Sequence, residues 1–137
     1  MNDKFTSVLK RGLVIWIIII IAESLHGTAR QLLLEPLLGD FRARQISVFI
    51  GAIIIIAITF VFVRWLKGSR VTDFIMIGSL WVILTVGFEI LLGRFAMGLS
   101  RERIASDYNL AAGGLMPLGL LAMLLAPVTL ARIYDEI

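Results

Sequence analysis

Two glutamates lie within strongly apolar stretches of this sequence. Glu23 directly follows the run Trp16-Ile17-Ile18-Ile19-Ile20-Ile21-Ala22, and Glu89 directly follows an apolar run that ends at Phe88. A carboxylate in a hydrocarbon environment costs several kcal/mol unless it is paired, protonated or hydrated. Both carboxylates therefore require either a structural partner or a function.

Each glutamate shares one helical face with other polar or small residues. The first face carries Glu23, His26, Gly27 and Arg30, at i, i+3, i+4 and i+7. The second face carries Thr85, Glu89 and Gly93, at i, i+4 and i+8. The glycine one turn beyond each glutamate lets a neighbouring helix or a ligand approach closely.

Two interpretations of these faces compete. In the structural one, Glu23 and Glu89 pair with Arg30, Arg94 or His26 near one membrane interface and hold two helical hairpins together. In the functional one, the two carboxylates and the imidazole bind a cation, a proton or a small basic ligand. The functional interpretation is favoured because ionisable residues within membrane spans usually mark functional sites. The predicted ligand- or proton-binding residues are Glu23, His26, Arg30, Glu89 and Arg94.

Metal binding is a separate alternative. Glu23 and His26 form a Glu-x-x-His pair, which di-iron sites in helical bundles use twice together with two further carboxylates. Leu92 stands where the second half would need its histidine, so the remaining metal hypothesis is a mononuclear Glu23, His26 and Glu89 site. A single histidine disfavours copper or bis-histidine haem unless two subunits each contribute one. No cofactor and no catalytic residue are predicted.

The composition indicates lipid as the solvent of these elements. Of 137 residues, 59% are hydrophobic and 17% charged, whereas soluble domains have about 45–50% and 25%. The absence of cysteine excludes disulfides, thiolate metal sites and thiol redox chemistry. The net charge is +3, but the basic residues lie between apolar stretches, as in membrane proteins, so no nucleic-acid binding is predicted.

The apolar stretches predict four membrane-spanning helices in one domain. Residues 45–63 carry no charge over about 28 Å of helix, and residues 109–131 form a second uncharged run. The first stretch starts at Gly12, with helical character to Leu34, and the third runs from about Phe74 to Leu99. The basic N-terminal stretch resembles a signal peptide but lacks a cleavage site, so we expect it to be retained as the first span.

Self-comparison predicts that the four helices are two tandem, duplicated hairpins, about residues 5–66 and 72–134. Residues 22–27 align with 88–93 at an offset of 66, and the order of matches continues with two single-residue shifts. The further matched pairs are Glu35 with Glu102, Asp40 with Asp107, Phe41 with Tyr108, Gly51 with Gly119, and Arg64 with Arg132. The result is a parallel repeat that brings Glu23 and Glu89 to similar depth, with chance similarity of apolar segments as the alternative.

The segments that join the helices within each hairpin mix arginine, acidic and aromatic residues. Residues 35–44 and 100–109 are expected to lie at the lipid headgroups, either as solvated segments with local ion pairs or as an arginine-based site for an anionic group. The candidates on this face are Asp40, Arg42, Arg44, Asp107 and Tyr108. At the start of the fourth helix, Gly113-Gly114 followed by Pro117 predicts a loosened or kinked turn beside a ligand cavity.

The charges that flank the spans give a weak orientation signal. With the N-terminus inside, seven basic residues lie on the cytoplasmic side and six on the other. All lysines, Lys4, Lys10 and Lys67, fall on the N-terminal side. Both termini are therefore predicted to be cytoplasmic, in a bacterial inner membrane, with dual topology as the alternative.

One short run is similar to a known family. Residues 21–28, Ile-Ala-Glu-Ser-Leu-His-Gly-Thr, resemble the first helix of small multidrug resistance transporters once one residue is inserted before Gly27. In that family a membrane-embedded glutamate in an Ala-Glu context exchanges protons for cationic drugs, which implies a proton-coupling role for Glu23. The likeness covers fewer than ten residues. The long charged connecting segments and the second glutamate, Glu89, depart from the family pattern, so the family itself is not adopted.

The function predicted from these observations is binding or transport of a small ligand, ion or proton at an intramembrane Glu/His/Arg site. The first alternative is a non-catalytic accessory or assembly subunit of a larger membrane complex, and the second is a metal-dependent or lipid-acting membrane enzyme. The expected partners are the lipid bilayer and either further copies of the chain or a larger complex. No phosphate-binding glycine loop with lysine and no Gly-x-Ser-x-Gly motif is present, so ATP-driven transport by this chain alone is not predicted.

Overall fold

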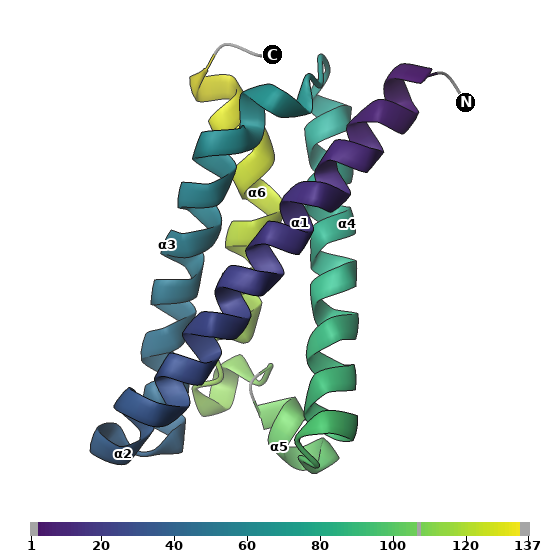
Figure 1. Cartoon of the computed structure of the whole chain (residues 1–137). Coiled ribbons are helices and arrows are strands. Elements are labelled where there is room, and N and C mark those ends of the chain that lie inside the picture. Colours follow the sequence, from purple (N-terminus) through teal and green to yellow (C-terminus); the bar gives the residue numbers. More distant parts are fainter. Residues whose placement is uncertain (1–2, 107, 135–137) are drawn as a thin grey trace.

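The computed structural model describes residues 3–106 and 108–134, and every regular element in them is helical (Figure 1). The elements are α1 (Asp3–Ala29), η1 (Arg30–Leu34), α2 (Glu35–Leu38), α3 (Asp40–Leu66), α4 (Val71–Leu91), η2 (Leu92–Ala96), α5 (Arg101–Ser106), η3 (Leu110–Ala112) and α6 (Met116–Ile133). Here η1 and η2 are π-helical and η3 is a 3-10 turn. The predicted all-helical fold is confirmed.

Four segments are long and apolar enough to cross a membrane: Asp3–Leu38, Asp40–Leu66, Val71–Ala96 and Met116–Ile133. The start of α1 and the end of α6 lie at one end of the molecule, and α2 and α5 lie at the other (Figure 1). Large apolar side chains are exposed along the outside, for example Ile21, Ile53 and Ile83. This surface is compatible with an integral membrane protein whose outer solvent is lipid.

The four long helices pack in a crossed arrangement. Both α1 and α6 pack against α3 and α4, and they do so on opposite sides of that pair (Figure 1). From its N-terminus, α1 runs obliquely from α4 towards α3 (Figure 1). Consequently α1 and α4 separate towards the end that holds α2 and α5.

The hydrophobic core fills the half of the bundle near the chain termini. Its members include Ile15 and Ile19 of α1, and its largest fully buried side chain is Trp81 of α4. The Trp81 Nε1 atom donates a hydrogen bond of 2.9 Å to the Gly12 carbonyl across the α1–α4 contact. Where α4 meets α6, a Cβ atom on Gly78 would overlap the Leu124 carbonyl, so the two backbones meet closely there.

Two short turns, between α3 and α4 and between α2 and α3, reverse the chain. The Asp73 carboxylate accepts hydrogen bonds from the backbone N–H groups of Ser69 and Arg70, at 3.0 and 3.1 Å, and so caps the start of α4. Between α2 and α3, Gly39 adopts φ of 84°, a conformation that favours glycine. These turns reverse the chain without a long loop.

The fourth span is shorter than the sequence predicted. The uncharged run begins at Asn109, but α6 begins only at Met116, after the turn η3 and a left-handed Gly113 with φ of 90°. Glycine ends the short turn, and Pro117 lies in the first turn of α6, where its missing N–H costs no hydrogen bond. Gly113 and Gly114 therefore form a connection beside the bundle instead of a fourth-helix turn.

Candidate functional site

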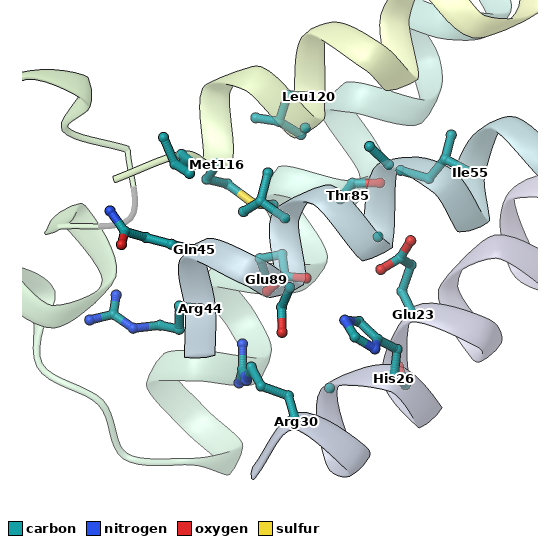
Figure 2. Close-up of a pocket in the computed structure, with 18 of the residues that line it drawn as sticks. Glu23, His26, Arg30, Arg44, Gln45, Ile55, Thr85, Glu89, Met116 and Leu120 are labelled. Atoms are coloured by element: carbon teal, nitrogen blue, oxygen red, sulfur yellow. The ribbon is translucent and has the colours of Figure 1, made fainter. Parts of the chain in front are cut away.

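A cavity of about 460 Å³ occupies the half of the bundle that the hydrophobic core leaves unfilled. All four long helices line it, and the segment from Gly113 to Leu115 closes part of it. Figure 2 shows Glu23 and His26 coming from α1 and Arg30 from the start of η1, with Glu89 and Thr85 facing them from α4. Four of the five residues predicted to bind a ligand or proton thus line one cavity: Glu23, His26, Arg30 and Glu89.

The two glutamates approach the cavity from different helices. Both line it, and their carboxylates are close enough to interact electrostatically. The Glu23 carboxylate packs against Gly51 of α3, where the missing side chain leaves room for it. A Cβ atom at position 51 would lie 2.9 Å from Glu23 Oε2 and 3.4 Å from Oε1.

Several residues that line the cavity have a buried polar atom with no hydrogen-bond partner in the described structure. These atoms are Glu23 Oε1, His26 Nε2, Arg30 Nε and Ser47 Oγ. The Ser47 side chain is only 8% exposed, and His26 lies against the Ser47 backbone. Because a buried polar atom without a partner costs about 1–3 kcal/mol, a group that enters the cavity gains by pairing with these atoms.

The deep end of the cavity is held by contacts between helices. Thr85 Oγ1 accepts a hydrogen bond of 3.0 Å from Trp16 Nε1 and donates one of 3.3 Å to the Met123 sulfur. These bonds join α1, α4 and α6, and Ile55 of α3 lies nearby at the same end (Figure 2). The deep wall is therefore fixed by side chains that are already paired.

The mouth of the cavity is built by α3 and the connections. Gln45 Nε2 donates a hydrogen bond of 2.8 Å to the Gly113 carbonyl, which ties the segment before α6 to α3. Arg44 lines the cavity and also forms an ion pair of 3.1 Å with Asp40, and Arg103 of α5 lies 3.2 Å from the same carboxylate. Asp40 thus links α3 to α5 by ion pairs beside the mouth.

The other predicted residues that the structure describes do not line the cavity. Arg94 is exposed on η2, and Arg42 is exposed on α3. Tyr108 is half-buried without lining the cavity, and Asp107 lies outside the described residues. Within residues 3–106 and 108–134, no group of three or more His, Cys, Asp or Glu side chains is placed to hold a metal ion.

Sequence reasoning did not single out three residues of the cavity wall on α3: Gln45, Ser47 and Gly51. The turn at Gly113-Gly114 was expected beside a ligand cavity, and both glycines line it. Gln45, Ser47 and Gly51 all belong to the uncharged run of α3. A serine and a glycine in such a run are common in helix contacts, so no local signal marks them. The spacing of Ser47 and Gly51, at i and i+4, is the one pattern that places them on a common face.

No family model, curated protein or solved structure matches this chain. The fold and the site nevertheless define a class: four apolar helices around a cavity that holds carboxylate, imidazole and guanidinium groups. In proteins generally, such groups make ionic and hydrogen-bond contacts with polar ligands.

Proposed function

We propose that this chain is a four-span membrane protein that binds a small polar ligand in the cavity between α1, α3, α4 and α6. The observation that carries the proposal is the concentration of unpartnered buried polar atoms in that cavity, on Glu23, His26, Arg30 and Ser47. Burial without partners is costly, and a ligand that pairs with these groups removes the cost. Glu23 and Glu89 are the principal binding residues.

The size of the cavity favours a small molecule over a proton or a bare ion. Its volume of about 460 Å³ lies within the 300–1,000 Å³ range typical of small-molecule sites. A bare ion needs only a few oxygen ligands around a much smaller space. We therefore expect an organic ligand that fills the region between Glu23 and Arg44.

The proposed architecture is a parallel duplication of two hairpins, α1 with α3 and α4 with α6. The packing supports it, because α1 contacts α3 as α4 contacts α6. A π-helical segment follows each glutamate-bearing helix, η1 after α1 and η2 after α4. A bacterial inner membrane with both chain termini in the cytoplasm is the proposed setting, and the cavity then opens at the opposite side.

Retention of a small molecule by the purified protein tests this function. The protein is extracted with its surrounding lipid in polymer particles, and the molecules released on denaturation are identified by mass spectrometry. We expect the wild type to retain a compound in about one copy per site. We expect this compound to be absent from the Glu23→Gln/Glu89→Gln double variant. Glu35→Gln is the matched control, because Glu35 lies on α2 and does not line the cavity.

Equal retention by the wild type and the double variant would place the ligand elsewhere. If the wild type carries no compound and a second protein co-purifies in fixed stoichiometry, an accessory role replaces ligand binding. Metal analysis of the same samples tests the Glu23, His26 and Glu89 metal hypothesis. Circular dichroism confirms that each variant keeps its helices.

A further inference from the structure

We infer that the ligand of this cavity is a phospholipid whose headgroup ends in a primary ammonium group. This inference rests on the proposed function and narrows its ligand class. Two independent features carry it: the opposite charges at two depths of the cavity, and the exposed apolar side chains of Leu92 and Met97 on the α4 side of the cavity. Their order matches the order of groups along such a lipid.

The charged groups are sorted by depth. Glu23 of α1 lies seven residues before Arg30, the first residue of η1, and so about 10 Å deeper along the helix axis. On α3, Arg44 lies at the outer end, and Gly51, which faces the Glu23 carboxylate, lies deeper. Figure 2 shows the same order, with the two carboxylates inside and both guanidinium groups nearer the mouth. A cationic group is therefore favoured at depth and an anionic group at the mouth.

The polar atoms at depth suit an ammonium group that donates hydrogen bonds. Glu23 Oε1 accepts no hydrogen bond, and the Ser47 hydroxyl has no partner although its side chain is almost fully buried. Both groups accept hydrogen bonds, and a primary ammonium group donates three. Arginine favours phosphate oxygens because its planar guanidinium group donates several hydrogen bonds in a fixed geometry. Arg30 lines the cavity, and its Nε atom has no hydrogen-bond partner in the structure.

Besides the mouth, the cavity has an exposed side where α1 and α4 diverge. The two helices contact each other near the core, where the Trp16 and Phe88 rings lie 6.4 Å apart, and α1 then leaves α4 towards α3 (Figure 1). Cavity-lining residues on both sides of this divergence are exposed. They are Ser24, Thr28 and Gln31 on the α1 side, and Leu92 and Met97 on the α4 side.

An amphiphile fits this geometry in one orientation. Its acyl chains lie in the bilayer outside the exposed side between α1 and α4, against Leu92 and Met97. Its phosphate lies at Arg30 and Arg44, and its ammonium group reaches Glu23 and Glu89. The acyl chains thus lie at the apolar side chains, the phosphate at the basic side chains and the ammonium group at the acidic side chains. A soluble zwitterion satisfies the charges but makes no use of the exposed apolar side.

Lipid-dependent thermal unfolding of the purified protein tests this inference. The wild type in detergent is titrated separately with phosphatidylethanolamine, with phosphatidylglycerol and with soluble glycerophosphoethanolamine. We expect phosphatidylethanolamine to raise the unfolding temperature at concentrations at least tenfold lower than either other compound. Equal effects of the two lipids would overturn the role of the ammonium group, and equal effects of the soluble compound would overturn the role of the acyl chains.

Substitutions inside and outside the cavity test whether the lipid preference depends on the cavity residues. Arg30→Gln and Glu89→Gln are each expected to reduce the preference for phosphatidylethanolamine at least tenfold, whereas Arg94→Gln, on the exposed face of η2, retains it. Loss of the preference in Arg94→Gln, or its survival in both cavity variants, contradicts the assignment. The comparison of lipids on the wild type decides the inference even if a variant does not fold.

The two proposals fail in different ways. If the wild type retains a non-lipid compound that Glu23→Gln/Glu89→Gln loses, the cavity binds a ligand and only its assignment to a phospholipid is wrong. If the wild type retains no compound and responds to none of the probes, both proposals are wrong.

Discussion

At the scale of single residues, Gly51 is the position on which the Glu23 carboxylate most directly depends. The carboxylate occupies the volume in which any larger residue at position 51 would place its Cβ atom, 2.9 Å from Glu23 Oε2. Real Cβ contacts are longer, so a side chain there has to displace the carboxylate. Gly51 therefore has a specific role although it has no chemistry of its own.

We predict that Gly51→Ala weakens ligand binding at least tenfold, about 1.4 kcal/mol, because it moves Glu23 from its position in the cavity. Occupancy by the retained compound, measured by mass spectrometry at several ligand concentrations, gives the change in affinity. Gly87→Ala is the matched control, since Gly87 lies within α4 and no atom comes within 4 Å of its added Cβ. Both changes raise helix propensity equally, so that contribution cancels in the comparison. Unchanged affinity in Gly51→Ala would show that binding does not depend on the Glu23 position.

At the scale of elements, the close crossing of α4 and α6 holds the second hairpin together. Gly78 lies against the backbone of Leu124, and nearby Trp81 fills the core and bonds to the Gly12 carbonyl of α1. Small residues permit such close contacts between membrane helices, where van der Waals packing replaces the hydrophobic effect as the driving force. This crossing lies on the core side of the cavity and fixes how far α4 and α6 can separate.

Gly78→Ala is expected to lower the free energy of unfolding by about 1–3 kcal/mol, because the new methyl group overlaps a backbone carbonyl that cannot rotate away. Thermal unfolding in detergent, followed by circular dichroism, measures the effect. Gly87→Ala again serves as the control, being in the same helix without a neighbouring atom. A Gly78→Ala protein as stable as the control would mean that α6 does not pack against α4 as described.

At the scale of the whole molecule, the bundle has two unlike ends. One end holds the start of α1, the end of α6 and the α3–α4 turn, where Lys4 Nζ donates a hydrogen bond of 2.6 Å to Ser69 Oγ. The other end holds α2, α5 and the cavity mouth (Figure 1). In the proposed membrane setting, an even number of candidate spans places the two termini on one side of the membrane, and α2 and α5 lie towards the other side.

Because the chain has no cysteine, single introduced thiols report the orientation without background. With the termini in the cytoplasm, a membrane-impermeant thiol reagent is expected to label Ala105→Cys, on α5, in intact cells. Ser69→Cys, in the α3–α4 turn, should react only after the membrane is permeabilised. The reverse pattern contradicts the proposed orientation, and labelling of both variants in intact cells indicates dual topology.

The helices themselves followed from local pattern, whereas the cavity did not. Uncharged runs such as residues 45–63 identified the spans because lipid requires apolar side chains and internally bonded backbone over a defined length. Helix periodicity and self-comparison placed Glu23 and Glu89 at similar depth and so predicted that they share one site. Both residues line the same cavity in the structure. Arg94 was expected at the same site, but beyond Leu91 the chain continues as the π-helix η2, which shifts the helical register and leaves Arg94 exposed.

By itself, the sequence determined an all-helical chain with four candidate spans, because apolar runs of this length reflect the solvent of the helix. It also singled out Glu23, His26, Arg30 and Glu89, because their positions depend on spacing within one helix. Only the tertiary structure decided that these residues face Ser47 and Gly51 of α3, that Gly113 closes the mouth, and that α6 begins at Met116. It also decided that exposed cavity-lining residues, such as Thr28 and Leu92, lie where α1 and α4 diverge. The physical reason is that cavities form where helices diverge, and crossing angles depend on contacts between residues far apart in the chain, such as Gly12 with Trp81 and Gly78 with Leu124.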